Sequence, residues 1–294
     1  MNTYVKEVQK ISVITLFLNV LLSVLKFILG FFGNSVALIY DAIHSLSDAG
    51  TTIIVIIGAR LGNKEEDDSH PYGHERIETM FVLCLSVILL VVGCLLFKSG
   101  AVNFYKIYKG DYLVEKPSKI ALIAALVSIL AKECMYRLTI LKAVELKSSL
   151  LLSDAKHHRS DALSSVGSFI GIIGGINGII WADSLASIAI SLMIGYSGLE
   201  LIKLATDELL DHCATEEDIT IIRESILSVP GVLSLDVLKT RMFADKVYAD
   251  VEISVDATLS ILEGHKIAED VHEAVEKSND KIKHCHVHVN PYME

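Results

Sequence analysis

The chain has 294 residues, of which 52% are hydrophobic, with a mean hydropathy of +0.49 and a formal net charge of −10. This acidity argues against a nucleic-acid-binding protein, which needs a basic face. The bunching of the apolar residues into long runs argues against a soluble domain, whose helices carry a polar stripe. The five cysteines form no Cys-x-x-Cys pair, so neither a disulfide framework nor a thiolate zinc site is expected.

Six segments before residue 207 are apolar and long enough to span a bilayer, which takes about 20 helical residues. Buried core helices of a soluble protein are the alternative, but runs such as Ile11–Leu29 and Met80–Leu96 have no polar stripe. We therefore predict a multi-pass α-helical membrane domain with six transmembrane helices over residues 1–207. In chain order its helices are expected at Val8–Phe32, Val36–Leu61, Glu75–Tyr105, Ser118–Leu146, Ser149–Gly175 and Trp181–Ala205.

The sidedness of the membrane domain follows from the number of helices and the placement of basic residues. An even number of spans puts both termini on the same side. Most of the Lys and Arg residues near the ends of the spans fall on that side, so the positive-inside rule predicts cytoplasmic termini. No cleavable signal peptide is expected, because the first apolar segment is long enough to span. We expect a multi-pass protein of the cell membrane.

The last part of the chain, residues 208–294, is predicted to be an acidic, soluble domain. From Asp207 to the end there are 19 acidic side chains and 8 basic ones. Helical periodicity and strand-like alternation follow one another as helix, two strands, helix and strand, an αββαβ order. This order predicts an open three-stranded sheet with its helices on one face. The expected elements are Glu216–Leu227, Val232–Arg241, Lys246–Val255, Leu259–Lys277 and His284–Val289.

Two of the predicted spanning helices carry the same pattern, a histidine followed four residues later by an aspartate. His44 and Asp48 lie on the second helix, and His157 and Asp161 lie on the fifth. Residues four apart share a helix face. Ionisable groups inside a membrane cost about 2.5–3.5 kcal/mol each, so they are expected to serve a function. Two such faces offer two imidazoles and two carboxylates, the four ligands of a tetrahedral zinc ion. An interhelical hydrogen bond is the alternative for a single pair.

The loop between the second and third helices also mixes carboxylate with imidazole. Asp67, His70 and His74 form a second candidate metal site, with an ordinary solvated loop as the alternative. His74 is followed by a glutamate, but the position three residues after that glutamate is Glu78 rather than histidine. The His-Glu-x-x-His motif of metalloproteases is therefore absent.

A third candidate metal site lies in the soluble domain. Alternate residues of the last strand are histidines, ending at His288, and so point to one face of the sheet. Asp236 and Asp250 lie on the other two strands, and His265 lies near the start of the second helix. We expect these four residues to share a metal ion. Surface histidines on a sheet are the alternative.

These features together resemble the cation diffusion facilitator family of divalent metal/proton antiporters. The resemblance covers nearly the whole chain, with six helices followed by an acidic, metallochaperone-like tail. Its specific marks are Ser35–Asp48, Asp67–His74 and His157–Asp161 with the Ala-Leu-Ser-Ser that follows. The resemblance implies a central transport site made by the two helical pairs and a second site in the loop.

The resemblance also implies a homodimer that is held partly by the tails. Arg76 and Asp211 stand where a charge interlock links the protomers in family members. In the tail the two candidate histidines match the best-known bacterial pattern. Asp236 and Asp250 stand where histidine is expected, which leaves the number of tail metals open.

The expected activity is export of a divalent cation rather than catalysis. Metal ligands must be deprotonated, so metal binding releases protons and proton binding releases metal; histidine, which titrates near neutral pH, suits this exchange. The phosphate-binding Gly-x-x-x-x-Gly-Lys-Ser/Thr motif is absent, so an ion gradient must drive transport. We therefore expect proton-coupled efflux by alternating access, with the metal ion as substrate and as a regulatory ligand of the tail.

The donor set indicates which metal is carried. Two histidines with two aspartates suit zinc, and also cadmium or cobalt, whereas an all-oxygen site would indicate manganese. Iron and manganese stay open as substrates. A membrane-anchored metal sensor and an intramembrane metalloenzyme are the rival interpretations, although four protein ligands leave no open position for catalysis.

Overall fold

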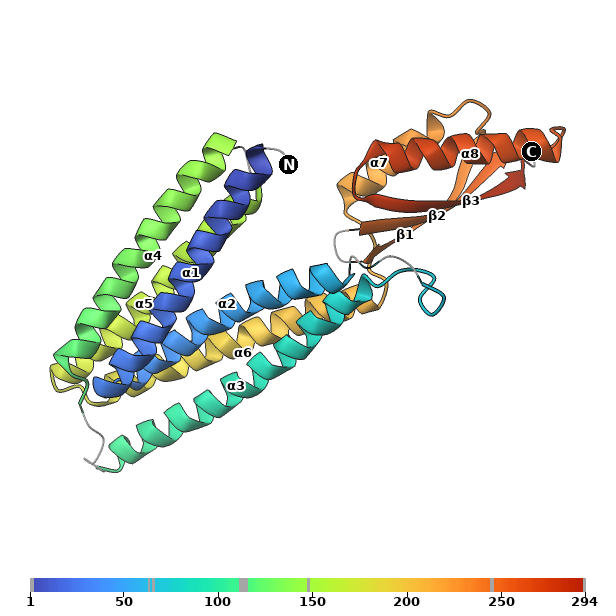
Figure 1. Cartoon of the computed structure of the whole chain (residues 1–294). Helices are drawn as coiled ribbons and strands as arrows, with labels where there is room; N and C mark the ends of the chain where they lie inside the picture. The colour runs from blue at the N-terminus through green and yellow to red at the C-terminus, as the bar shows by residue number, and fades with distance from the viewer. Residues whose placement is uncertain are drawn as a thin grey trace. The chain divides into compact units, whose positions relative to one another are not determined.

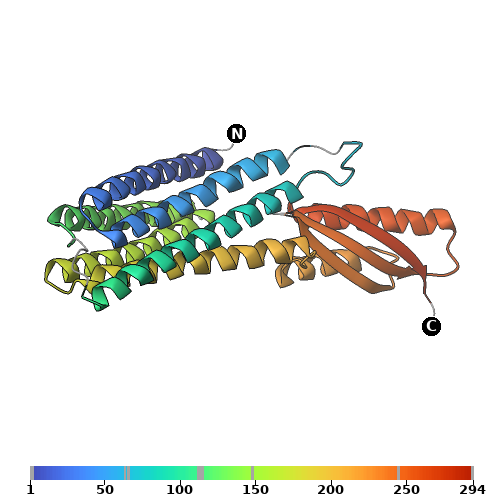
Figure 2. The ribbon, with the colours of Figure 1, turned by 90° about the horizontal axis from the view of Figure 1, so that it is seen from below.

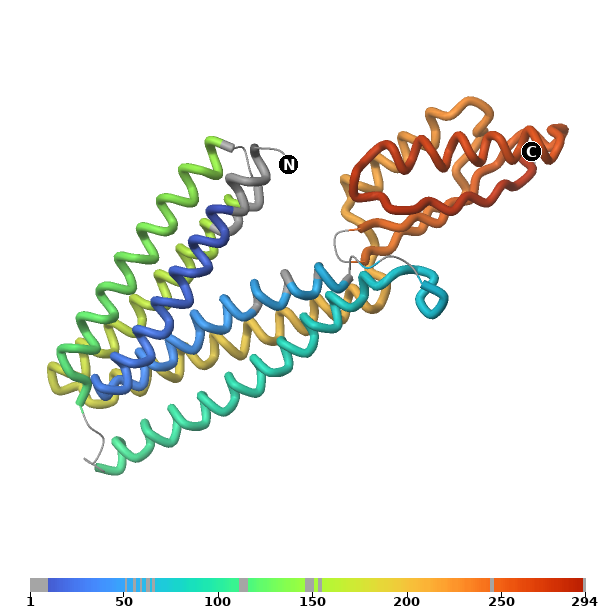
Figure 3. Tube along the Cα trace, viewed as in Figure 1, coloured from blue at the N-terminus to red at the C-terminus, as the bar shows by residue number. Residues whose placement is uncertain are grey.

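The computed structural model describes residues 3–62, 64, 67–110, 116–146, 149–243 and 246–292, and their path can be followed in Figure 3. The described chain confirms the predicted fold class of a helical membrane domain followed by an αββαβ domain. Element ends differ from the predicted ones by only a few residues. The long helices are α1 (Thr3–Phe32), α2 (Val36–Gly62), α3 (Arg76–Tyr108), α4 (Lys119–Leu146), α5 (Ser149–Ile176) and α6 (Trp181–Leu209).

The elements of the C-terminal domain are α7 (Glu216–Leu227), β1 (Ser234–Phe243), β2 (Lys246–Val255), α8 (Ile261–Ser278) and β3 (Ile282–Pro291). Contacts divide the chain into two compact units. The first unit comprises Met1–Ile56 and Cys84–Leu201, which include most of the long helices. The second comprises Ile57–Leu83 and Ile202–Glu294, so the loop between α2 and α3 belongs to the same unit as the C-terminal domain.

The first unit exposes apolar side chains and buries polar ones, the reverse of a soluble protein. Phe17, Leu95 and Leu163 are 66%, 62% and 69% exposed, whereas Lys26 and Lys132 are 1% and 0% exposed. Within the described residues, three helices are apolar enough by length and composition alone to cross a membrane: Lys10–Phe32 of α1, and all of α3 and α6. The other long helices, α2, α4 and α5, carry most of the buried ionisable residues of the described unit, among them Asp41, Lys132 and Asp161.

The helices pack through small residues. Gly93 of α3 lies against Gly195 of α6, because a Cβ atom at Gly93 would be 2.8 Å from the Gly195 Cα atom. Small residues allow such close approach between membrane helices. Figure 1 shows α1, α4 and α5 diverging from α2, α3 and α6 on the side away from the α5–α6 turn, and Figure 2 shows the long helices following a common direction.

The start of α2 is held by a carboxylate from α6. Asp183 accepts hydrogen bonds from Ser35 Oγ at 2.7 Å and from the Val36 N–H at 2.9 Å. An anion at this place satisfies N–H groups that have no partner within the helix and complements the helix dipole. The contact ties the helix that carries His44 and Asp48 to α6.

The C-terminal domain is a three-stranded sheet in the order β1-β2-β3, with β1 antiparallel and β3 parallel to β2. The parallel pair needs a crossover, which α8 supplies. Val251 of β2 packs in one core with Ile222 of α7 and Val271 of α8, so both helices cover the same face of the sheet (Figure 1). A capping box between Ser260 and Glu263 fixes the start of α8.

Candidate metal centre

His44 and Asp48 of α2 meet Asp161 of α5 inside the first unit. Each of the three offers one ligand atom, and these atoms all lie within 4.8 Å of one another. The Nδ1 atom of His44 lies 4.0 Å from Oδ2 of Asp48. That oxygen is buried and has no hydrogen-bond partner among the described residues. Since buried polar atoms are nearly always partnered, it is suited to bind a cation.

His157, the fourth predicted ligand, lies beside this cluster rather than in it. Its side chain is 51% exposed, and its Nε2 atom is 3.8 Å from Oδ1 of Asp161. All four predicted ligands line one cavity of about 640 Å³, whose α6 wall adds Tyr196 and Glu200. The structure therefore brings ligand atoms of three of the four residues within 4.8 Å of one another and places His157 at the same cavity.

Lys132 of α4 is a residue of this centre that the sequence analysis missed. Its Nζ atom lies 2.5 Å from Oδ2 of Asp161, and the lysine side chain is fully buried. The sequence held a signal for it, because a single lysine that follows the apolar run Ile120–Ala131 must find a partner or a wet cavity inside a membrane. Asp161 thus contacts a lysine as well as the cluster.

A second buried ion pair lies one helical turn before His44. Lys26 of α1 donates to Asp41 Oδ2 at 3.0 Å and to Ser45 Oγ at 2.8 Å. Ser165 of α5 also donates to Asp41, at 2.9 Å. This network joins α1, α2 and α5 about one helical turn from the cluster. Its hydrogen bonds satisfy buried charges that would destabilise the protein if they were left unpaired.

The loop candidates come together as the sequence predicted. Asp67, His70 and His74 offer ligand atoms within 4.8 Å of one another. His70 Nδ1 lies 3.2 Å from Asp67 Oδ1, and His74 Nε2 lies 3.4 Å from Asp67 Oδ2. The Nδ1 atom of His74 is buried without a hydrogen-bond partner among the described residues. The turn is closed by N–H groups of residues 69 and 70 that donate to Asp67 Oδ1 at 3.0 and 2.9 Å.

A lysine is already in contact with the loop carboxylate. Lys64 donates to Asp67 Oδ2 at 2.7 Å. This hydrogen bond, followed by those from the backbone and side chain of His70, holds the pKa of Asp67 well below its usual range. The carboxylate is therefore charged at neutral pH, the form that binds metal.

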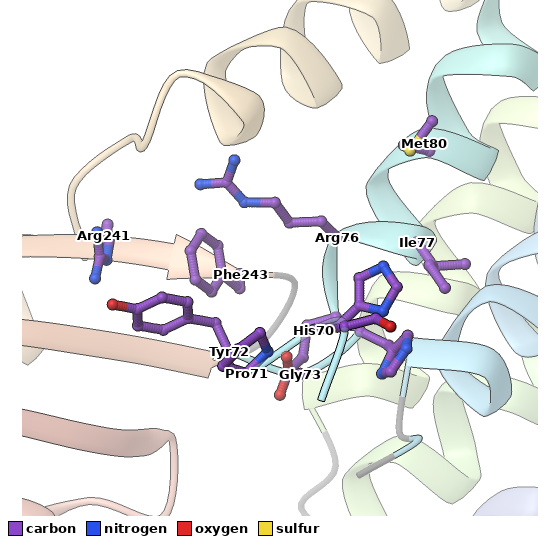
Figure 4. Close-up of a pocket in the computed structure, with 12 residues that line it drawn as sticks. His70, Pro71, Tyr72, Gly73, Arg76, Ile77, Met80, Arg241 and Phe243 are labelled. Carbon is purple, nitrogen blue, oxygen red and sulfur yellow. The ribbon is translucent and has the colours of Figure 1, made fainter. Parts of the chain in front are cut away.

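The loop lines a cavity of about 620 Å³ together with the end of β1 (Figure 4). Arg76 at the start of α3 points its guanidinium over the Phe243 ring, 4.6 Å from the ring centroid, and donates to Asp211 Oδ1 at 2.6 Å. Arg76 and Asp211 therefore form a pair within one chain. Lys283 of β3 forms a further ion pair with Glu75 of the loop.

The four tail candidates do not meet within one protomer. Asp236 lies at a bulge of β1 and accepts from Ser254 Oγ at 2.6 Å. Asp250 is four residues from Ser254 along β2, a distance of about 13 Å in a strand. His265 pairs with a glutamate one turn along α8, at 3.4 Å. His288 stands on β3 opposite residue 252 rather than Asp250. The register of the strands therefore separates these candidates, although they lie on neighbouring elements.

Two domain families match the chain by sequence. Residues 12–210 match the cation efflux transmembrane domain. Residues 214–292 match the cytoplasmic domain of cation efflux proteins, ZT_dimer, whose name indicates a dimer. The two matches together cover nearly the whole chain.

Two bacterial or archaeal proteins are similar over more than nine tenths of the chain. An uncharacterized transporter of Methanocaldococcus jannaschii is 32% identical over 97% of this chain and 99% of its own length. The manganese efflux system protein MneS of Bacillus subtilis is 33% identical over 92% of this chain and 91% of its own. Among solved structures, a nickel form of the MamM C-terminal domain is 29% identical, covers 27% of this chain and 100% of that chain, and has a TM-score of 0.26.

Proposed function

The chain belongs to the cation efflux family of divalent-cation transporters, and from this premise we propose that it exports zinc from the cytoplasm in exchange for protons. The observation that carries the proposal is the cluster of His44, Asp48 and Asp161 in a cavity of the membrane unit. The charged and polar groups of that cavity would be costly in a membrane without a cation to bind.

The coupling to protons follows from the ligand chemistry. The cluster binds metal when its imidazole is neutral and its carboxylates are ionised, and it releases metal when protons take their place. Alternating access exposes the site first to the cytoplasm, where metal displaces protons, and then to the opposite side, where protons displace metal. His157 lies beside Asp161 at the cavity and joins the ligands as the fourth donor in this proposal.

Zinc is proposed from the donor set of two histidines and two carboxylates, which suits a tetrahedral ion. Manganese is the second candidate, and a specific observation favours it. The ligand atoms that lie within 4.8 Å of one another come from one imidazole and two carboxylates, whereas His157 is half exposed beside them. A set richer in oxygen suits a harder ion. The similar protein MneS is named for manganese efflux.

The remaining sites and the assembly belong to the same proposal. Residues 1–207 form the transport domain of a cell-membrane protein with both termini in the cytoplasm. Residues 208–294 form the part that senses metal and joins two copies into a homodimer. Asp67, His70 and His74 bind a second ion near the cytoplasmic side. Regulatory metal binds in the C-terminal domain, where Asp236, Asp250, His265 and His288 serve as separate donors, because they do not meet within one protomer.

Metal flux into proteoliposomes with an imposed pH gradient tests the proposal. Zinc, manganese, iron and cadmium are compared for the wild type, for His44→Ala and for the control His212→Gln, which changes an exposed histidine of the other unit. Zinc flux that follows the gradient and disappears only in His44→Ala supports the proposal. Faster manganese flux favours the second candidate. A folded protein that binds zinc but moves no metal would leave the sensor interpretation in its place.

A further inference from the structure

Three metal-ligating side chains gather in the C-terminal domain away from the expected tail site. His272 and Glu276 lie one turn apart on α8, and His284 lies on the neighbouring edge strand β3. Each offers one ligand atom, and these atoms all lie within 4.8 Å of one another. The rings of the two histidines meet edge to face, with centroids 5.4 Å apart.

The carboxylate of Glu276 is the centre of the group. Its Oε1 atom lies 3.3 Å from Nε2 of His272 and 3.1 Å from Nδ1 of His284. A tetrahedral zinc ion with bonds of about 2.0–2.1 Å has ligand atoms about 3.3 Å apart. The two distances from Glu276 Oε1 to the histidine nitrogens are therefore close to the distance between ligand atoms in a tetrahedral zinc site. In the described part of the chain, both ion-pair partners of Glu276 are these histidines.

Backbone groups of Cys285 on β3 hold two of the three side chains, His272 and Glu276, in place. His272 Nδ1 lies 2.7 Å from the carbonyl oxygen of Cys285, so this nitrogen donates a proton to the carbonyl, and Nε2 is the ring nitrogen that faces Glu276. Metal-binding histidines commonly donate their second N–H to a carbonyl in this way. The Cys285 N–H donates to Glu276 Oε1 at 3.2 Å and holds the carboxylate in place.

The group is distinct from the sites already considered. It shares no residue with the loop trio, with the cluster in the membrane unit or with the four tail candidates. Its side chains are partly exposed, at 37% for His272, 30% for Glu276 and 56% for His284, so an ion can reach them from solvent.

We propose that His272, Glu276 and His284 form a binding site for a borderline-soft divalent metal ion, Zn²⁺ or Co²⁺, that ties the second half of α8 to β3. Two imidazoles and one carboxylate favour these ions over Mg²⁺ and Mn²⁺, which prefer oxygen ligands. Water completes the coordination, since three protein ligands leave one position of the tetrahedron free.

The test measures metal stoichiometry in the full-length protein in detergent. Bound Zn²⁺ per protomer is counted after equilibrium dialysis, and the visible absorption of bound Co²⁺ reports tetrahedral sites. The double variant His272→Gln, His284→Gln is compared with the wild type and with His212→Gln, an exposed histidine that also contacts a backbone carbonyl. Glu276→Gln is the second variant, because it keeps the shape of the side chain and removes its charge.

We expect the double variant to lose one equivalent of Zn²⁺ per protomer and the matching part of the Co²⁺ absorption. Glu276→Gln is expected to bind that equivalent at least about tenfold more weakly, and His212→Gln is expected to be unchanged. Unaltered stoichiometry and absorption in both trio variants, with an unfolding transition like that of the wild type, would overturn the proposal. So would an equal loss in His212→Gln. Flux is measured separately, so failure of transport leaves this result unaffected.

Discussion

The ammonium nitrogen of Lys132 on α4 lies 2.5 Å from a carboxylate oxygen of Asp161 on α5, and both side chains are buried. The same carboxylate lies within 4.8 Å of ligand atoms of His44 and Asp48. A metal ion bound at the proposed transport site would therefore share this aspartate with the lysine. At such short range in a poorly solvated site the two positive charges would repel each other, so we expect the lysine to weaken metal binding and to favour release.

Replacing Lys132 with methionine is expected to tighten metal binding at the central site. The variant removes a positive charge and keeps the length of the side chain, so Asp161 is free to bind the ion. Zn²⁺ affinity should rise by about tenfold or more, and release into the far compartment should slow. Titration of the purified protein and proteoliposome flux measure the two effects. The control is Lys142→Met, which removes an exposed lysine of the same helix. Equal effects of both variants on Zn²⁺ affinity and flux would contradict the role of Lys132 in weakening metal binding.

The free energy of unfolding of the protein should depend on Lys132 and Asp161 jointly rather than independently. Lys132→Met alone leaves a buried carboxylate without its cation and is expected to lower the free energy of unfolding by about 3–5 kcal/mol. The double variant Lys132→Met, Asp161→Leu removes both charges and should recover most of that loss. Thermal unfolding in metal-free detergent solution measures this cycle. Strictly additive losses would mean that the two groups do not interact.

The different positions of His44 and His157 allow their roles as proposed ligands to be tested separately. His44 is buried within the three-residue cluster, whereas His157 is 51% exposed beside it. His44→Ala should abolish flux and leave the amount of protein in the membrane unchanged. His157→Ala should abolish flux too if it serves as the fourth ligand during transport. A flux of His157→Ala near that of the wild type would restrict the proposed site to His44, Asp48 and Asp161.

Asp211 has a left-handed backbone, with φ of 58°, and its carboxylate pairs with Arg76. Asp211→Asn keeps a residue that tolerates this conformation and removes only the ion pair, which is about half exposed and so contributes about 0.2–1 kcal/mol. Asp211→Val loses the pair and adds backbone strain of about 1–2 kcal/mol. Chemical denaturation should therefore rank Asp211→Val clearly below Asp211→Asn. Equal stabilities would exclude a strained backbone at this position.

The thiol of Cys285 is expected to resist alkylation at pH 8, whereas the exposed Cys213 reacts. Burial raises the pKa of Cys285 from an ordinary value of 9.0 to about 12, so the reactive thiolate is scarce. Because the folded-state pKa is the higher one, the associated stability is fully present below pH 9 and is lost as the pH rises toward 12. Mass spectrometry after iodoacetamide treatment measures the two rates. The unfolded chain, in which both thiols should react alike, is the control.

Features that depend on residues near one another in the sequence were predictable. A long apolar run has few ways to satisfy its backbone in a membrane other than as a helix. The spacing of four residues places His44 with Asp48, and His157 with Asp161, on one helix face before any packing is considered. The short loop likewise brings Asp67, His70 and His74 together, because few residues separate them.

Features that depend on the register between elements were decided by the tertiary structure. The lysine partner of Asp161 comes from another helix. The sequence of α4 does not show which residue of α5 lies beside Lys132, because that depends on how the two helices pack. Asp236 and Asp250 lie on adjacent strands, but the pairing of β1 with β2 sets them far apart. The parallel pairing of β3 brings His284 beside the second half of α8. Local periodicity fixes which face a side chain takes, whereas contacts across elements are fixed by how the apolar faces pack.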